Sequence, residues 1–239
     1  MKATQGNLES VIRIGMKAPD FTAVTTFGTL RFSDLAGKWV VFFSHPGDFT
    51  PVCTTEFIAF AKYSPYFSQR NVQLLGLSID SNPAHLAWVH NIYQNTGVQI
   101  PFPVIADRSG EIARLYGMIA PDVSATETVR NTFIIDDRQN IRANLAYPLT
   151  NGRNIPEILR LVDALQTSDR EGIVTPANWV PGQSALVPPP RTYRELSERE
   201  KGSPGLQCVD WYWCYRQPAS HPVPCAERDR ADSSLKKEG

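Results

Sequence analysis

The chain has 239 residues, long enough for one large domain or for one domain with a substantial extension. Its 24 basic and 24 acidic residues give a formal net charge of zero, which argues against nucleic acid or an anionic membrane held by bulk charge. The first residues lack an apolar run of signal-peptide length, and no later run approaches about 18 apolar residues, so we expect a soluble cytoplasmic protein with no membrane partner.

Strand-like and helix-like segments alternate through the first two-thirds of the chain. Apolar runs predict strands at 29–32, 39–44, 72–79, 102–105, 131–135 and 141–146, the last two joined as a hairpin. Helical periodicity predicts helices at 54–69, 84–94, 110–116 and 155–166, the first of them kinked or shortened at Pro65. This alternation predicts an α/β layered domain over residues 1–167.

The composition changes after residue 167. Residues 168–239 are rich in proline and contain a charged, helix-like stretch at 193–201 and an aromatic block at 206–215. This segment has too few aliphatic residues to bury a core of its own. We therefore expect a C-terminal arm that packs on the first domain or across a dimer.

Four cysteines, Cys53, Cys208, Cys214 and Cys225, are too sparse for a secreted disulfide scaffold. Cys53 follows a loop with two prolines and a glycine and falls at the first turn of a predicted helix. Unpaired backbone N–H groups and the helix dipole favour an anion there, so the position favours a thiolate. The alternative is a buried core cysteine, because free cysteine packs as a small apolar residue.

The stretch 45–57, HPGDFTPVCTTEF, resembles the active-site loop of the peroxiredoxins, whose signature Pro-x-x-x-Thr-x-x-Cys is met by Pro46, Thr50 and Cys53. Segments 15–21, 76–81 and 130–136 agree with the family in the same order. The start at His45 and the long C-terminal extension resemble the peroxiredoxin 6, or one-cysteine, subfamily. The resemblance implies a thioredoxin-like fold and a thiol peroxidase for hydrogen peroxide and alkyl hydroperoxides, without metal or organic cofactor.

In the chemistry that the family implies, Cys53 attacks one peroxide oxygen while the other leaves with the bonding electrons. A free thiol is a few per cent thiolate at pH 7, so full ionisation raises the thiolate fraction, and with it the rate, only about thirty-fold, or about 2 kcal/mol. Other groups therefore have to stabilise the transition state. The resemblance assigns this to the Thr50 hydroxyl, Arg130 and the amides near Val52. Pro46 is expected to shape the pocket.

Three more side chains are candidates for this site. Arg153 lies where the subfamily carries a second arginine near the cysteine, although a solvated charge before a helix is the alternative. His45 could hydrogen-bond near the peroxide or simply end its strand. Glu56 is expected to orient Arg130 or Arg153, because an unpaired carboxylate one turn beyond Cys53 would disfavour the thiolate.

The C-terminal cysteines bear on how oxidised Cys53 is restored. Attack on peroxide leaves a sulfenic acid that another thiol has to reduce. The aromatic block resembles that of archaeal and some bacterial members of the subfamily, in which the second cysteine, here Cys214, bonds Cys53 across a dimer. Cys208 would then exchange with Cys214 and present a disulfide to a thioredoxin-like reductant. Cys225 matches no family position. Zinc bound by these three cysteines and His221 is the alternative, but the usual Cys-x2-4-Cys pair is absent.

The resemblance also implies a homodimer, and decameric rings of dimers occur in the family. A one-cysteine mechanism with an external thiol and a chaperone-like oligomer remain alternatives. A general disulfide oxidoreductase would need Cys-x-x-Cys at the helix start, and Thr50 stands three residues before Cys53. Some subfamily members carry a Gly-x-Ser-x-Gly lipase site; residues 35–39 lack that serine, so no lipase activity is predicted.

Overall fold

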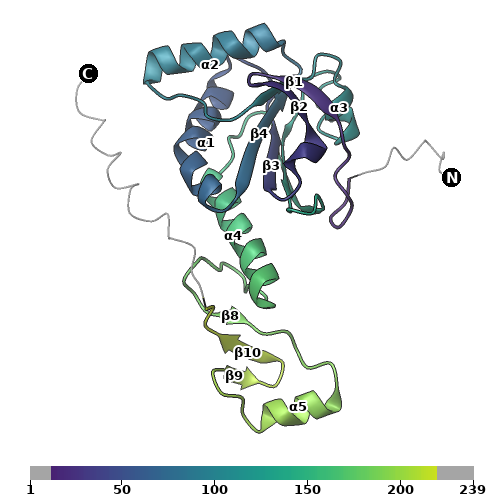
Figure 1. The fold of residues 1–239 in the computed structure, drawn as a ribbon, viewed down its shortest axis with the longest axis vertical. Helices are drawn as coiled ribbons and strands as arrows, with labels where there is room; N and C mark the ends of the chain where they lie inside the picture. Colours follow the sequence, from purple (N-terminus) through teal and green to yellow (C-terminus); the bar gives the residue numbers. More distant parts are fainter. Residues whose placement is uncertain (1–11, 220–239) are drawn as a thin grey trace, which may run out of the picture. The chain divides into compact units, whose positions relative to one another are not determined.

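The computed structural model describes residues 12–219, so Cys225 and His221 of the alternative zinc site lie outside the described residues. The chain divides into two compact units, Met1–Ile155 and Pro156–Gly239 (Figure 1). The predicted boundary near residue 167 falls inside a helix, α4, which begins at the last residue of the first unit. In the part of the chain that the structure describes, no helix is long and apolar enough to cross a membrane.

A seven-stranded sheet with the order β2-β1-β5-β4-β3-β6-β7 forms the centre of the first unit. Its strands are β1 Thr22–Thr25, β2 Gly28–Arg31, β3 Trp39–Ser44, β4 Val72–Ser78, β5 Val104–Ala106, β6 Arg130–Ile135 and β7 Ile141–Tyr147. The pairs β3–β4 and β4–β5 are parallel, and the other neighbours are antiparallel. Strand β3 therefore lies inside the sheet, with a partner on each side.

Helices cover both faces of this sheet. They are the 3-10 helix η1 Phe32–Leu35 and the α-helices α1 Pro51–Gln69, α2 Asn82–Thr96 and α3 Glu111–Leu115. In Figure 1, α1 and α3 lie on opposite sides of strands β3 and β4. All six residues of β3 are buried, as expected of a strand with both faces covered.

Adjacent residues of β3 supply the two cores. Phe42 faces a cluster with Tyr116 and Phe133, its ring centroid 4.9 Å from that of Tyr116. Phe43 faces the other way and stacks on Phe60 of α1 with centroids 4.1 Å apart. This two-sided packing fixes the carboxyl end of β3, from which the loop to α1 departs.

The prediction that Pro65 shortens the first long helix is wrong. Helix α1 runs through Pro65 to Gln69, although proline there removes one backbone hydrogen bond. Phe60 and Phe67, on either side of the proline, are both fully buried. Their packing holds the helix together across the lost bond.

The second unit contains helix α4 Ile155–Glu171, helix α5 Tyr193–Glu200 and the strands β8 Ala185–Leu186, β9 Gln207–Asp210 and β10 Trp213–Arg216. The three strands form an antiparallel sheet with the order β8-β10-β9. The aromatic block is thus the β9–β10 hairpin. Within it Cys208 and Cys214 are paired in register and joined by a disulfide with an S–S distance of 2.06 Å.

Candidate active site

The start of α1 places Cys53 in a buried first turn. The N-cap residue Thr50 has an extended backbone, Pro51 opens the helix, and the Thr54 amide donates to the Thr50 carbonyl at 3.0 Å. Proline is favoured at this position because its fixed φ suits the helix and it has no N–H to satisfy. Cys53 is a free thiol with no exposed surface. The helix begins three residues earlier than predicted, and Cys53 lies inside its first turn.

Arg130 contacts the sulfur directly. It opens β6, the neighbour of β3, and is 3% exposed. Its Nη1 donates to Cys53 Sγ at 3.2 Å and to Glu56 Oε2 at 2.8 Å. Its Nε and Nη2 donate to the Leu149 carbonyl at 3.0 and 2.8 Å, which fixes the plane of the guanidinium. A charge-assisted hydrogen bond of this kind is stronger when the sulfur is a thiolate.

Glu56, one turn beyond Cys53, joins two arginines. Its carboxylate accepts from Arg153 Nε and Nη2 at 2.8 and 2.7 Å, and from Arg130 Nη1. Burial alone would raise the pKa of Glu56, but the hydrogen bonds and charge of Arg153, together with the charge of Arg130, lower it. The carboxyl is therefore ionised. Two buried arginines and one buried carboxylate leave one positive charge in excess beside the Cys53 sulfur.

Arg153 is held entirely by protein groups. Its backbone N–H donates to Glu56 at 2.8 Å, and its Nη1 donates to the Asn131 carbonyl at 3.0 Å and to Thr132 Oγ1 at 3.1 Å. Its guanidinium lies over the Phe43 ring, 5.1 Å from the centroid. Arg153 thus reaches the sulfur through Glu56 and Arg130.

The loop before α1 is fixed by hydrogen bonds of its own. Thr50 Oγ1 donates to the Gly47 carbonyl at 2.9 Å, so the hydroxyl proton is used inside the loop and the oxygen keeps its acceptor lone pairs. Pro46 is partly buried in the same loop. Val52 lies against Gly152, where a side-chain carbon would come to 3.4 Å from Val52 Cγ1.

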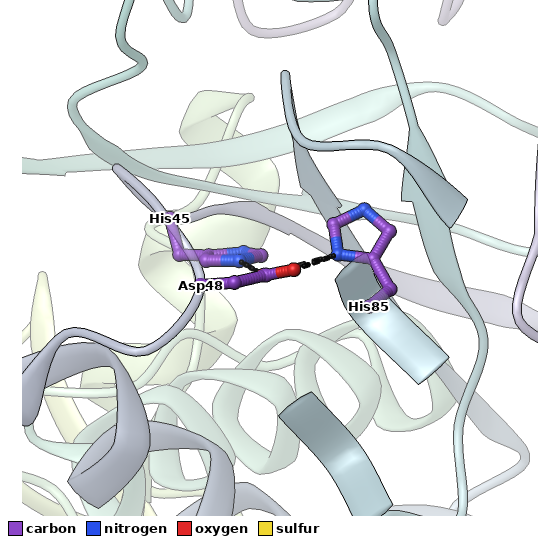
Figure 2. A group of neighbouring side chains, drawn as sticks. All are labelled: His45, Asp48 and His85. Carbon is purple, nitrogen blue, oxygen red and sulfur yellow. Dashed lines mark hydrogen bonds and ion pairs between the residues drawn. The ribbon is translucent and has the colours of Figure 1, made fainter. Parts of the chain in front are cut away.

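His45 does not simply end its strand. Its Nε2 lies 3.0 Å from Asp48 Oδ1, and His85 of α2 approaches the same carboxylate with Nδ1 at 2.8 Å from Oδ2 (Figure 2). The His45 ring also stacks on Trp88, with centroids 5.1 Å apart. Burial lowers the pKa of His45 despite the nearby Asp48. Burial would raise the pKa of Asp48, but the hydrogen bonds from both imidazoles outweigh it and lower that pKa.

Among the described residues, His45, Asp48 and His85 form a cluster whose donor atoms could hold a metal ion. One donor atom from each lies within 4.8 Å of the others. The donors already bind one another, however, because both rings contact the carboxylate. A metal would have to replace these contacts.

The two cysteines of the C-terminal disulfide differ in solvent exposure. Cys208 is exposed and Cys214 has no exposed surface. A reagent in solution can therefore approach the sulfur of Cys208 and not that of Cys214.

Comparison with known proteins agrees with this geometry. Residues 14–144 match the model of the AhpC/TSA family, and residues 164–203 match the C-terminal domain of 1-Cys peroxiredoxin. The chain is 60% identical over 205 residues to peroxiredoxin 2 of Caldanaerobacter subterraneus subsp. tengcongensis, covering 86% of this chain and 93% of that one. It is 54% identical over 219 residues to a peroxiredoxin of Aquifex aeolicus, covering 87% and 98%.

Solved structures agree as well. A yeast mitochondrial 1-Cys peroxiredoxin superposes with a TM-score of 0.78 at 40% identity, covering 87% of this chain and all of that one. A variant of the peroxiredoxin 6 of Arenicola marina gives a TM-score of 0.78 at 35% identity, covering 87% and 98%. The chain belongs to the peroxiredoxin family. The predicted thioredoxin-like α/β fold with a C-terminal extension is confirmed, and the protein is a thiol peroxidase that uses peroxide substrates and a thiol reductant.

The predicted residues of this peroxiredoxin fall into three groups. Cys53 and Arg130 are in direct contact, Thr50 caps the helix that carries the thiol, and Arg153 is joined to this pair by Glu56. His45 binds Asp48 and His85, two residues that were not predicted, and Cys208 and Cys214 form their own disulfide in the second unit. Asp48 stands inside the quoted motif, so its position was available; nothing in the local sequence marks His85.

Proposed function

We propose that this peroxiredoxin reduces hydrogen peroxide and alkyl hydroperoxides with Cys53 as the attacking thiolate. The observation that carries the proposal is the hydrogen bond from Arg130 Nη1 to Cys53 Sγ at 3.2 Å. It places a fixed cation on the sulfur of a free cysteine that is otherwise enclosed. A buried structural thiol needs no such partner.

In the first step the thiolate attacks the hydroxyl-bearing oxygen of the peroxide and the O–O bond breaks. The bonding electrons leave on the other oxygen, which takes up a proton as water or alcohol, and Cys53 becomes a sulfenic acid. Negative charge thus moves from sulfur to oxygen, beside a guanidinium that Leu149 and Glu56 already hold in place. The Thr50 oxygen accepts the hydrogen bond of the peroxide hydroxyl, since its own proton is donated to Gly47.

For Arg153, expected from the resemblance as a second arginine near the cysteine, we propose a positioning role. Its contacts with Glu56, Asn131 and Thr132 occupy the guanidinium. Together with Glu56 it sets the angle and charge of Arg130. Pro46 and Val52 are proposed as the walls of the peroxide pocket beside these charged groups.

For the second half of the cycle we propose that Cys214 resolves the sulfenic acid. Its thiol condenses with the sulfenic acid, releases water and forms a Cys53–Cys214 disulfide; Cys208 then attacks Cys214 and frees Cys53. The Cys208–Cys214 disulfide and the exposure of Cys208 support this order, because an external thiolate can attack Cys208. We propose a thioredoxin-like reductant; the structure of the yeast relative concerns resolution by glutathione and thioredoxin systems.

The assembly implied by the family also belongs to the proposal. We propose a homodimer to which the C-terminal arms contribute. A decameric ring, a cytoplasmic location and a chaperone-like oligomer are predictions that stand beside it. Direct reduction of Cys53 by an external thiol is the alternative chemistry.

The test is peroxide consumption in the presence of thioredoxin, thioredoxin reductase and NADPH. We expect Cys53→Ser to abolish turnover, while Cys225→Ser, the control at a cysteine without a family position, behaves like the wild type. Undiminished peroxide consumption by the Cys53→Ser variant would refute the assignment of Cys53 as the attacking thiolate.

A further inference from the structure

Asp48 ties the loop between β3 and α1 to the elements behind it. Its backbone N–H donates to Asp80 Oδ2 at 2.9 Å, and the same oxygen accepts from Ser78 Oγ at 2.8 Å. Its carboxylate, 2% exposed, contacts His45 at the end of β3 and His85 on α2 (Figure 2). The middle of the loop is thus anchored through both its main chain and its side chain.

His85 contacts two acceptors, one with each ring nitrogen. Its Nε2 lies 3.1 Å from the Ile105 carbonyl, which only accepts, so Nε2 carries a hydrogen. Its Nδ1 lies 3.0 and 2.8 Å from the two oxygens of Asp48. The hydrogen bonds of both imidazoles outweigh the burial of Asp48 and lower its pKa, so an ionised carboxylate faces the ring. The ring is thus held between the Ile105 carbonyl of β5 and the Asp48 carboxylate of the loop.

His45 is the second imidazole at the Asp48 carboxylate. Burial lowers its pKa, and its Nε2 donates to Asp48. Its Nδ1 is buried and has no hydrogen-bond partner among the residues that the structure describes. The charged groups that face His85 are therefore Asp48 directly and Asp80 one contact further away, through the Asp48 amide.

The residue next to this anchor has an unfavourable backbone. Phe49 has φ of 55°, in the left-handed region, and its side chain is largely exposed. Such a conformation in a bulky residue persists where neighbouring contacts over-determine it, and it is found at sites that switch. Phe49 separates Asp48 from Thr50, so release of Asp48 would let the turn relax and move the start of α1.

We propose that His85 is a positioning residue whose hydrogen-bonded contact with Asp48 holds the loop closed for peroxide reduction and has to open before Cys53 can form a disulfide. The proposal rests on the proposed function. Cys53 has no exposed surface, and a disulfide needs the two sulfurs within bonding distance. The loop must therefore open after each oxidation.

The test separates the two half-reactions in the full-length protein. His85→Phe removes both ring nitrogens and keeps an aromatic ring at the same position. His90→Phe is the matched control, because His90 is an exposed histidine on the same helix. Stopped-flow fluorescence gives the rate of oxidation by one equivalent of peroxide, and acid-quenched non-reducing mass spectrometry gives the rate of disulfide formation.

We expect His85→Phe to slow oxidation about tenfold or more, as loss of a positioning contact does, and to speed disulfide formation severalfold. Less sulfinic acid should then form in excess peroxide, and His90→Phe should match the wild type throughout. A residue with only a structural role would slow both steps alike. Unchanged rates, or equal slowing of both, overturn the proposal.

A second variant covers the case in which His85→Phe does not fold. Asp48→Asn keeps the shape of the anchor and removes its charge, so it should shift the two rates in the same opposite directions. Metal analysis of the purified wild type is the remaining check, since one bound metal ion per chain at this cluster would replace the contact between His85 and Asp48 and overturn the proposal. Failure of the proposed function is recognised separately, by full activity in Cys53→Ser.

Discussion

Replacement of Arg130 by lysine tests the contact on which the chemistry depends. The guanidinium makes four hydrogen bonds at once, one with the Cys53 sulfur, one with the Glu56 carboxylate and two with the Leu149 carbonyl. A lysine keeps the charge, but its ammonium is a single point on a flexible stem and cannot hold this fork. Loss of one preorganised donor to a reacting centre costs roughly 10²–10³ in rate, about 2.7–4 kcal/mol. We expect Arg130→Lys at the lower end, about a hundredfold, because the charge is retained.

Stopped-flow fluorescence with one equivalent of peroxide measures this directly. Trp88 is a suitable reporter, since its Nε1 donates to Thr54 Oγ1 at 3.2 Å, next to the reacting cysteine. Arg31→Lys is the matched control, because Arg31 pairs with Asp20 on an exposed part of the first unit. Oxidation of Arg130→Lys within about threefold of the wild-type rate, with the fold intact, would refute the argument that a fixed cation on the sulfur supplies the rate.

Three further outcomes follow from the same structure. Glu56→Gln should lower the free energy of unfolding by about 3–5 kcal/mol near pH 7 in urea titrations, since two buried arginines lose their counter-charge. The folded pKa of Glu56 is below its ordinary value of 4.5, so its stabilisation is complete above that value and is lost as pH falls through the folded pKa; the two proteins should converge in acid. Gly76→Ala should cost about 1–3 kcal/mol by the same titration, because its new carbon would lie 3.3 Å from the buried Phe57 ring; an unchanged midpoint would contradict the packing. Cys214→Ser should reduce one peroxide per Cys53 and then stop with thioredoxin, and steady turnover would show that another thiol resolves the sulfenic acid.

The parts of the fold that the sequence predicts well are those set by local pattern. The strand at 39–44 is found with the predicted bounds, since a continuous apolar run suits a strand covered on both faces. The start of α1 was placed three residues late, because Pro51 was read with the loop although proline is favoured at the first helical position. Pro65 was expected to kink or shorten the helix, but the helix continues to Gln69, with Phe60 and Phe67 buried on either side of the proline.

What local pattern cannot supply is the pairing of distant side chains. Glu56 and Arg153 are 97 residues apart, and Asp48 and His85 are 37 apart; the sheet order brings each pair together. The family resemblance predicted that Thr50, Cys53 and Arg130 share a site, but only the structure shows that Glu56 binds both arginines. The β9–β10 hairpin was missed because its strands are short, mostly exposed and interrupted by a bulge, which leaves little alternation to detect.

In the proposed cycle, Cys53 is oxidised by peroxide and restored through Cys214. The most direct measurement is non-reducing mass spectrometry of peptides from the fully reduced protein after one equivalent of peroxide. A Cys208→Ser variant should be treated in parallel, since it blocks the exchange step and preserves the first disulfide. We predict a Cys53–Cys214 disulfide in the variant and a Cys208–Cys214 disulfide with free Cys53 in the wild type. Cys53 joined to Cys225, or left as a sulfenic or sulfinic acid with no disulfide, would contradict the account.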